Sequence, residues 1–480
     1  MLRSIAAGLA LAFLASTAQA SVTFVGHTTT PGDAADLSGF AGGPNGNRLS
    51  FGSDLFYERA SGIFWGITDR GPGGGLIDFA PRVTQFDLAL NADGSVNNLT
   101  LLRTVVFRKA DGSLFTGLNP RLVSGDAGNL GLSFDSEGFV KLKNGNMLVA
   151  DEYGPSVYEF DRDGIFIRAF QTPANLLPRE ADGDLNFVDG RPTIVSGRQD
   201  NRGFEGLTVS PDGKTAYAIL QDPLVNEGRA GQGRRSPNLR IVAYDVASGE
   251  QVSQFVYQLE PISSINQRTP NPFEENNQGR NIGVSSITAI GQGKFLVIER
   301  DNRGLGVDDP TASGNAIGTK RVYLIRLAGA TDVKDISFAG SSELPQGVMP
   351  VQKQLFLDVH AALVAAGVPA AEKLEGLAFG PFINGGLSMI LVSDNDFSVT
   401  QTGQGVQFDV CTSGIGGISS QVALGAACPD GQALIKTYTY VFKVSGDSLA
   451  LVPEPATWAM MIAGFGLVGG ALRRRRAAMA

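Results

Sequence analysis

Residues 143–155 read KNGNMLVADEYGP, and this stretch decides the fold class. The turn residues Asn144 and Gly145 lead into the apolar run 147–150, which ends on two adjacent carboxylates, Asp151 and Glu152. A short apolar run bounded by turn residues is typical of a buried β-strand. A buried strand that ends on two like charges needs a physical reason, and the same arrangement recurs along the chain.

Five segments combine a glycine turn, a short apolar strand and acidic residues at the end of that strand. They end at Asp69-Arg70, Asp151-Glu152, Gln221-Asp222, Glu299-Arg300-Asp301 and Asp394-Asn395-Asp396. Four of them follow a second apolar strand, which begins with Glu-Gly in three cases and with two serines in the fourth. These pairs are Glu137-Gly138, Glu205-Gly206, Ser285-Ser286 and Glu375-Gly376. The repeated unit is predicted to be a β-hairpin with acids at both outer ends, since an antiparallel pair returns the chain to the edge it left.

Five copies of one hairpin, about 70–95 residues apart, indicate a repeat architecture with long insertions. All-β repeats of this size favour a β-propeller, in which hairpin ends approach one face near the axis. We expect six blades, within a range of five to seven. Further apolar runs, predicted to be the outer strands, lie at 82–90, 155–161, 239–246, 321–327 and 437–444. One inserted helix is predicted over 351–367 from the spacing of its apolar residues, with His360 as a surface or packing residue.

The composition narrows the class of protein. The 480 residues carry a formal net charge of −8 with both signs mixed, which argues against a nucleic-acid partner and fits a soluble acidic protein. Only two histidines are present, His27 and His360, so neither a histidine dyad nor a histidine-rich zinc site is expected. Cys411 and Cys428 lie in a Gly/Ser-rich loop, and in an oxidising compartment they are expected to form one disulfide.

Both ends of the sequence carry targeting signals. Residues 1–20 combine Arg3, an apolar stretch and the cleavage-site residues Ala18-Gln19-Ala20, as in a secretory signal peptide. Residues 451–480 combine Pro453-Glu454-Pro455, the apolar segment 458–472 and an arginine block at 473–476. This segment resembles the PEP-CTERM sorting signal of Gram-negative bacteria, which implies a short transmembrane helix, only transient membrane contact and removal by an exosortase. A plain C-terminal membrane anchor is the alternative. We therefore expect an exported, cell-surface, matrix or secreted protein with one propeller domain over 21–450.

The motifs resemble those of the phytase-like domain family, also described by an esterase-like activity of phytase. The similarity rests on Glu137-Gly138, on the ADEYGP segment 150–155, on the ERD segment 299–301 and on LVSDNDF at 391–397. It extends from about residue 39 to 444, nearly the whole mature chain. The cysteine loop departs from the family pattern between SDNDFS and the last strand, and we expect it to be a surface excursion that leaves the core intact.

If the hairpins are radial, their acids meet at one end of the axis. Crowded carboxylates have raised pKa values unless a cation neutralises them, and oxygen-rich clusters suit Ca²⁺ or another hard divalent cation. The predicted metal ligands are Asp69, Glu137, Glu299, Asp301, Asp394 and Asp396, and the predicted catalytic carboxylates are Glu205, Asp151, Glu152 and Glu375. Arg70, Arg202, Arg300 and Arg303 are predicted to bind a phosphorylated substrate, because guanidinium groups pair with phosphate oxygens. Asp222 and Arg198 belong to the same set of polar residues.

Three functions stay open from the sequence. The first is a metal-dependent hydrolase of phosphate mono- or diesters that uses direct attack by water. The second is a non-catalytic, cation-binding propeller of the cell surface or matrix. The third, a carboxylester hydrolase, is least supported, because the sequence has no GxSxG motif. Any single acid at a strand end can also have a purely architectural role, such as capping a turn.

Overall fold

The computed structural model describes residues 21–42, 46–91, 93, 95–402 and 405–445. The predicted signal peptide and the predicted C-terminal apolar helix lie outside these residues. Among the helices that are described, none is both long and apolar enough to cross a membrane.

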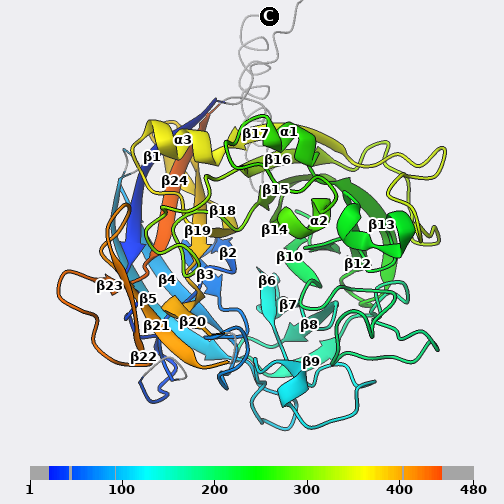
Figure 1. Ribbon diagram of the computed structural model, residues 1–480, viewed down its shortest axis with the longest axis horizontal. Coiled ribbons are helices and arrows are strands. Elements are labelled where there is room, and N and C mark those ends of the chain that lie inside the picture. The colour runs from blue at the N-terminus through cyan, green and yellow to red at the C-terminus, as the bar shows by residue number, and fades with distance from the viewer. Residues whose placement is uncertain (1–20, 43–45, 92, 94, 403–404, 446–480) are drawn as a thin grey trace, which may run out of the picture.

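Five four-stranded antiparallel sheets are arranged as blades around a central axis (Figure 1). The first blade consists of β2 (Asp54–Glu58), β3 (Ile63–Ile67), β4 (Arg82–Leu90) and β5 (Val96–Val106). The second consists of β6 (Ser136–Lys141), β7 (Met147–Asp151), β8 (Ser156–Phe160) and β9 (Phe166–Ala169). The third consists of β10 (Phe204–Val209), β11 (Thr215–Leu220), β12 (Asn238–Asp245) and β13 (Gln251–Gln258). The predicted hairpins form the two innermost strands of each blade.

The fourth and fifth blades complete the ring. The fourth consists of β14 (Gly283–Gly291), β15 (Lys294–Arg300), β16 (Lys320–Arg326) and β17 (Gln352–Asp358). The fifth consists of β18 (Lys373–Ile383), β19 (Gly386–Asp394), β24 (Thr437–Ser445) and β1 (Ser21–Thr30). The innermost strands contact one another in the closed order β2, β6, β10, β14, β18 and back to β2. The ring therefore has five blades, at the lower end of the expected range.

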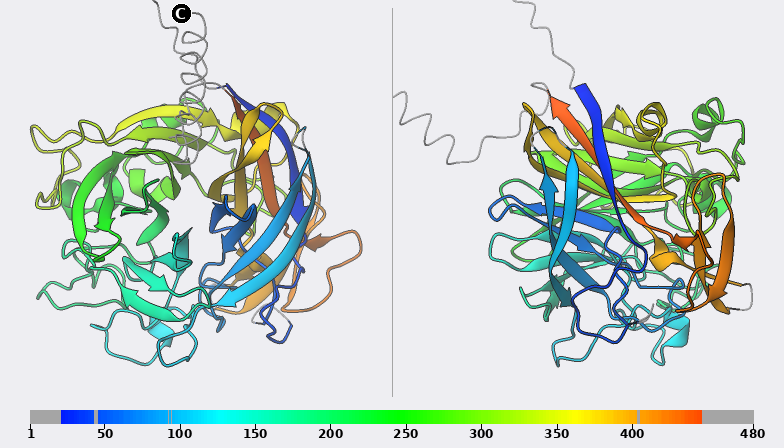
Figure 2. Two further views of the ribbon diagram at one scale, coloured as in Figure 1. Left: turned by 180° about the vertical axis from the view of Figure 1, so that it is seen from behind. Right: turned by 90° about the vertical axis from the view of Figure 1, so that its left-hand side faces the viewer.

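A sixth four-stranded sheet accounts for the difference from six blades. It consists of β20 (Val399–Gln401), β21 (Gln407–Thr412), β22 (Ser419–Ala423) and β23 (Ala433–Leu434). This sheet is inserted between β19 and β24 and lies beside the ring, outside the circle of blades (Figure 2, right). The predicted disulfide joins Cys411 of β21 to Cys428 in the loop between β22 and β23, with a Cα–Cα distance of 5.7 Å. The expectation of a surface excursion is confirmed.

The hydrophobic core is divided among the five interfaces between blades, because each interface contains its own cluster of buried side chains. Trp65 of the first blade packs with Phe139 and Val149 of the second, for example, and Leu296 of the fourth packs with Met389 of the fifth. The other three interfaces have equivalent clusters. Sheets that pack face to face in a circle bury both of their faces, which explains why β7 is buried along its whole length and apolar over 147–150.

The ring is closed by two distant parts of the chain. Strand β1 is the outermost strand of the fifth blade and pairs antiparallel with β24 from Ser21 opposite Ser445 to Thr30 opposite Thr437 (Figure 2, right). This pairing, which has one register shift between Phe24 and Gly26, contributes one edge of a blade whose other three strands come from residues 373–445.

The predicted helix over 351–367 is only half correct. Residues 352–358 form β17, the outermost strand of the fourth blade, and the helix α3 is confined to Val359–Ala365. Asp358 ends the strand and caps the helix, since its side chain accepts a hydrogen bond from the backbone N–H of Ala361 at 3.0 Å. Two further short helices, α1 (Ile262–Asn266) and α2 (Gln278–Asn281), lie in the link between the third and fourth blades.

Candidate functional site: an acidic mouth at one end of the axis

The Glu-Gly pairs place carboxylates at the axis through an irregularity in the strand. The pairing of β10 with β11 shifts between Phe204 and Gly206, so Glu205 lies in a β-bulge. Equivalent shifts occur at Glu137, Ser285 and Glu375. Because a bulge interrupts the regular alternation of side chains, it can re-aim one of them out of the sheet face.

The glycine of each pair allows neighbouring blades to approach closely. A Cβ atom on Gly206 would lie 2.7 Å from the backbone nitrogen of Ile287 in β14. A Cβ on Gly138 would lie 2.5 Å from the nitrogen of Leu207, and one on Gly376 would lie 3.0 Å from the carbonyl carbon of Asp54. The two residues of the Glu-Gly motif therefore have different roles. The glycine lets the inner strands of neighbouring blades pack closely, and the glutamate places a carboxylate beside them.

Asp54 crosses the axis below these carboxylates. Its carboxylate accepts hydrogen bonds from the backbone N–H of Phe139 in β6 at 2.9 Å and from the hydroxyl of Ser286 in β14 at 3.3 Å. Strand β14 is not a neighbour of β2 in the ring, so this contact spans the centre. Burial raises the pKa of Asp54 well above its usual value.

The aspartates that end the second strand of a blade share one architectural role. Asp69, Asp151, Asp301 and Asp394 each accept a hydrogen bond from the backbone N–H two residues later, at 2.7–3.2 Å. This is the turn-capping geometry of aspartate, so the architectural interpretation is correct for these four residues. Asp69 and Asp394 also have carboxylate oxygens within 4.8 Å of each other.

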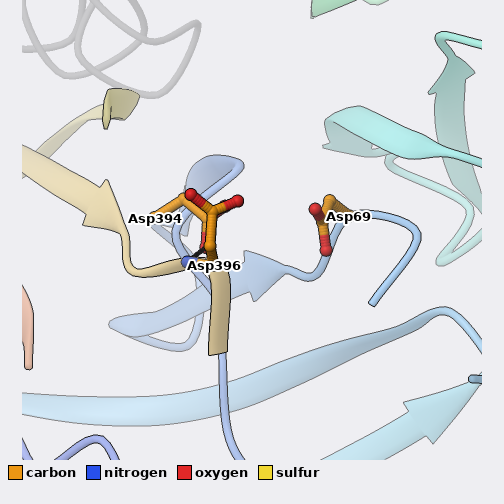
Figure 3. Close-up of side chains that lie close together, drawn as sticks. All are labelled: Asp69, Asp394 and Asp396. Atoms are coloured by element: carbon orange, nitrogen blue, oxygen red, sulfur yellow. Dashed lines mark hydrogen bonds between the residues drawn. The ribbon is translucent and has the colours of Figure 1, made fainter. Parts of the chain in front are cut away.

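Three groups of three carboxylates run side by side across this end of the ring, each with oxygens within 4.8 Å of one another. The first triad is Asp69, Asp394 and Asp396, the second is Asp69, Asp135 and Glu137, and the third is Glu137, Glu152 and Glu205. Figure 3 shows Asp69, on the link after β3, facing Asp394 and Asp396 at the end of β19. Asp69 belongs to the first two triads and Glu137 to the last two, so the groups form one continuous row.

Four cationic side chains neutralise part of this row. Arg70 lies 2.9 Å from Asp135 and 3.9 Å from Glu152, and Arg202 lies 3.5 Å from Glu152 and 3.6 Å from Asp222. Arg300 pairs with Glu375 and lies 3.9 Å from Glu205, while Lys373 pairs with Asp394 and Asp396. We call the following set of side chains the acidic mouth: Asp69, Arg70, Asp135, Glu137, Glu152, Arg202, Glu205, Asp222, Arg300, Lys373, Glu375, Asp394 and Asp396.

Two carboxylates of the mouth have oxygens without a partner. Glu137 is 7% exposed, yet its side chain forms no hydrogen bond or ion pair with any residue that the structure describes. Glu205 is 2% exposed, and its Oε1 accepts a hydrogen bond from Gln221 at 2.5 Å, whereas its buried Oε2 has no partner among the described residues. Leaving a buried carboxylate oxygen unsatisfied is costly, so Oε2 of Glu205 needs a proton or a cation, and a cation there would also neutralise Glu137.

Burial and mutual repulsion raise the pKa values of the mouth. Burial raises the pKa of Glu205 to about 8, with a further contribution from Glu375, and that of Asp394 to about 7, with a further contribution from Asp396. The pKa values of Glu137 and Glu152 are raised well above their usual range, first by burial and then by Glu205. For Asp222, the nearby Arg202 opposes the effect of burial, and its pKa is about 6. A hard divalent cation bound to oxygens of the second and third triads would relieve this repulsion, and the donor set of carboxylates fits such an ion.

Several predicted site residues lie away from the mouth. Asp151 points into the second blade, where three backbone N–H groups, those of Asp135, Tyr153 and Gly154, bind its carboxylate at 3.1–3.2 Å. Glu299 lies between the third and fourth blades and accepts a hydrogen bond from the hydroxyl of Tyr257 at 2.5 Å.

Asp301 and two arginines are likewise outside the mouth. Asp301 is paired with the buried Lys320 at 3.1 Å and accepts hydrogen bonds from the backbone N–H groups of Gly318 and Thr319. Arg303 stacks on the ring of Phe273, with 3.6 Å between its guanidinium carbon and the ring centroid, and Arg198 donates to the backbone carbonyl of Tyr153 at 2.7 Å. The charged groups of Asp301, Arg303 and Arg198 therefore stabilise the conformation of loops.

Two residues of the mouth, Asp135 and Lys373, were missed by sequence reasoning, as was Asp54 at the axis. Asp135 belongs to the second triad, Lys373 neutralises the first triad, and Asp54 crosses the axis. The sequence did carry a signal for two of them, since Asp135 lies two residues before Glu137 and Lys373 lies two residues before Glu375. Side chains two apart in a regular strand share one face, so a search of the positions two residues before each motif glutamate would have found both.

A five-bladed propeller with a carboxylate-lined mouth is thus the class of protein that fold and site define. Residues 48–397 match the phytase-like family, described as "Esterase-like activity of phytase", and the chain belongs to this family. Residues 451–476 match the PEP-CTERM protein-sorting motif, which implies processing by an exosortase-type enzyme. The chain is an exported protein of a Gram-negative bacterium.

Known proteins resemble this chain to different degrees in sequence and structure. A protein of Arthroderma benhamiae described as an "Uncharacterized secreted protein" is 29% identical over 468 residues, which cover 79% of this chain and 87% of the relative. Among solved structures, a luciferin-regenerating enzyme is 10% identical with a TM-score of 0.32, covering 89% of this chain and 97% of its own. The periplasmic gluconolactonase of Pseudomonas aeruginosa is 12% identical with a TM-score of 0.30, covering 87% and 99%. These structural scores are too low to bear on activity.

Proposed function

We propose that this protein is a secreted, divalent-cation-dependent hydrolase of phosphate monoesters or diesters that acts at the acidic mouth. The observation that carries the proposal is the combination of an unsatisfied carboxylate row with arginines that remain partly open to solvent. The side chains of Arg70 and Arg202 are 18% and 25% exposed, respectively, while their carboxylate partner Glu152 is 3% exposed.

The charge balance links the substrate to the cation. The mouth contains nine carboxylates and only four cationic side chains, so a phosphate group alone would be repelled. A bound cation reverses the local field and leaves Arg70 and Arg202 free to bind phosphate oxygens. The site then favours a phosphate ester only when the cation is present.

The proposed roles follow from the contacts. Glu137, Glu152 and Glu205, together with Asp69 and Asp135, would hold Ca²⁺ or another divalent cation. When bound, such an ion polarises a phosphoryl oxygen and makes a water molecule more acidic. These contacts favour Glu152 and Glu205 as cation ligands over their predicted role as bases.

Asp394 takes the proton from the attacking water in this proposal. Its pKa of about 7 is suited to proton transfer near neutral pH, and it lies beside Asp69 in the first triad. Arg300 holds Glu375 and faces Glu205, so this pair positions the glutamate row.

The test is hydrolysis of p-nitrophenyl phosphate, bis-p-nitrophenyl phosphate and phytate, with Ca²⁺, Mg²⁺ or Mn²⁺ and after chelation. We expect turnover that requires the cation, and a loss of about 100-fold in kcat/KM for Asp394→Asn and for Arg202→Met. Arg103→Met is the matched control, since Arg103 lies on the outer strand β5 and pairs with Asp163 at 2.7 Å. Full turnover after exhaustive chelation would refute the proposal.

The two other functions are distinguished in the same experiment. A cation-dependent rise in melting temperature without turnover of any ester would support the non-catalytic cation-binding propeller. Cleavage of p-nitrophenyl acetate alone would support a carboxylester hydrolase. The structure gives that mechanism little support, because neither histidine lies at the acidic mouth. His27 stacks with Tyr438 on the outer edge of the fifth blade, and His360 lies on α3.

A further inference from the structure

The second and third triads share one residue, Glu137, whose carboxylate therefore lies between two groups of acidic side chains. Glu137 has an oxygen within 4.8 Å of oxygens of Asp69 and Asp135 on one side, and of Glu152 and Glu205 on the other. We propose that the mouth holds two divalent cations side by side, bridged by the carboxylate of Glu137. A carboxylate has two oxygens and can bind one cation with each, as a bridging ligand requires.

The state of Glu137 distinguishes this site from an ordinary acidic cluster. Glu137 is only 7% exposed, and it has no hydrogen-bond or ion-pair partner within the described part of the chain. The Oε2 atom of Glu205, in the third triad, is buried and unpartnered as well. Both groups are aimed at the same row of oxygens, and each lacks the compensating contact that a buried charge needs.

The first triad provides an internal comparison. The ammonium group of Lys373 pairs with Asp396 and lies 4.0 Å from Asp394, so a side chain of the protein already supplies the positive charge there. Among the residues that the structure describes, no lysine enters the other two triads. Arg70 reaches Asp135 and Glu152, Arg202 reaches Glu152 and Arg300 approaches Glu205, but none of these arginines pairs with Glu137. The carboxylates left without a cationic partner thus centre on Glu137, where the second and third triads meet.

A pair of cations also refines the substrate. Two cations about 3.5–4 Å apart can bind two oxygens of one phosphate group and stabilise both the attacking and the leaving oxygen. Arg70 and Arg202 lie on either side of Glu152 and would bind the remaining phosphate oxygens. This part of the inference rests on the proposed function, whereas the two-cation site itself does not.

The test uses Mn²⁺ alone as the probe, on the mature full-length protein after chelation and dialysis. Equilibrium dialysis should give two Mn²⁺ per chain, and the electron paramagnetic resonance spectrum should show two spin-coupled ions. In Glu137→Gln we expect the spin coupling to disappear and the stoichiometry to fall to one or zero. Because this substitution keeps the shape and removes a charge from a crowded row, the folded state should persist, which circular dichroism will verify.

Glu372→Gln is the matched control. Glu372 is also a buried carboxylate, 3% exposed, and burial also raises its pKa to about 8, but it belongs to none of the three triads. This variant should keep two coupled Mn²⁺ ions. If it loses them to the same degree as Glu137→Gln, a general effect of buried charge explains the result and the bridging role is wrong.

The outcomes separate the two proposals. One Mn²⁺ per chain, or two ions without spin coupling, would overturn the two-cation site even if phosphate esters are hydrolysed. Two coupled ions that depend on Glu137, without turnover of any phosphate ester, would support the site and refute the proposed function.

Discussion

Gly206 leaves no room for a side chain, because the neighbouring inner strand lies against it. The atoms that a Cβ would meet, the nitrogen of Ile287 and the carbonyl carbon of Ser286, belong to the backbone and cannot rotate away. We therefore expect Gly206→Ala to lower the free energy of unfolding by about 1–3 kcal/mol, the usual cost of overpacking. Urea denaturation followed by circular dichroism measures this change.

The control for Gly206 is another strand glycine without such a neighbour. A Cβ on Gly26 in β1 would meet nothing within 4 Å, so Gly26→Ala should change the stability little. Equal effects of the two substitutions would show that the close approach of β10 and β14 has no energetic importance.

Asp151 and Glu152 are adjacent in the sequence but serve different purposes. Asp151→Ala removes the acceptor of three backbone N–H groups and should cost roughly 2–3 kcal/mol of stability, measured by urea denaturation. Glu152→Gln should leave the stability unchanged or higher and weaken cation binding at least tenfold, measured by calorimetry with Ca²⁺. The reverse pattern would place Asp151 at the functional site.

This pair also shows what the sequence could predict about the site. Recurrence identified the hairpin ends that carry the carboxylates, and Glu137, Glu205, Glu375, Asp69 and Asp394 all lie at the mouth. It could not separate Asp151 from Glu152, since successive side chains of a strand point to opposite sides and the register at its last residue depends on tertiary contacts. Glu299 and Asp301 were assigned to the site for the same reason, and the structure places both elsewhere.

At the scale of elements, the inserted sheet is attached to the ring by a few strong contacts. Arg48, just before the first blade, pairs with the buried Asp409 of β21 through two hydrogen bonds of 2.6 and 3.2 Å. Phe79 packs edge-on against Phe397 with ring centroids 4.9 Å apart, and the backbone N–H of Gly416 donates to the carbonyl of Thr311 at 2.8 Å. The insertion therefore bridges loops of the first and fourth blades.

Removing the disulfide should loosen this insertion and spare the ring. The bond closes a loop with a sequence separation of 17 residues, for which the loss of chain entropy in the unfolded state is worth about 3 kcal/mol. In Cys411→Ser with Cys428→Ser, limited proteolysis should cut between residues 412 and 428, while circular dichroism of the remaining sheets stays constant. Global unfolding at the temperature of this cleavage would contradict independent behaviour of the insertion.

The same scale explains the partial success of the fold prediction. Apolar runs flanked by turn residues identified β4, β8, β12, β16 and β24 nearly to the residue, because most residues of these strands are buried. The run over 351–358 was mistaken for a helix because β17 is an edge strand, where Lys353 and Leu355 are partly exposed and no clean alternation remains. Strand β1 was missed entirely, since its partner lies more than 400 residues away, with Ser21 and Ser445 separated by 424 positions.

For the whole molecule, the charge of the mouth makes stability depend on pH. Burial and neighbouring carboxylates raise the pKa of Glu205 to about 8 and that of Asp394 to about 7, and outside the mouth they raise the pKa of Glu372 to about 8. The unfolded chain releases these protons near pH 4, so the stabilisation from these groups is complete below that pH and is lost as the pH rises towards 8. We expect the melting temperature of the chelated protein to fall between pH 5 and pH 8.

Scanning calorimetry in EDTA and in excess Ca²⁺ measures this dependence. Calcium should raise the melting temperature more at pH 8 than at pH 5, because at low pH protons compete for the same oxygens. A melting temperature that rises from pH 5 to pH 8 in EDTA would mean that deprotonation of these carboxylates does not destabilise the folded protein.

The pairing of β1 with β24 has a consequence for the order of events during secretion. A polypeptide that crosses a membrane from its amino end delivers β1 first, and the strand that pairs with it is the last of the propeller to arrive. Until then, β1 and the half-built fifth blade expose unsatisfied strand edges, which are prone to pair with other chains. Completion of the circle therefore waits for completion of translocation, and a periplasmic holdase that shields extended segments would protect the nascent protein during this interval.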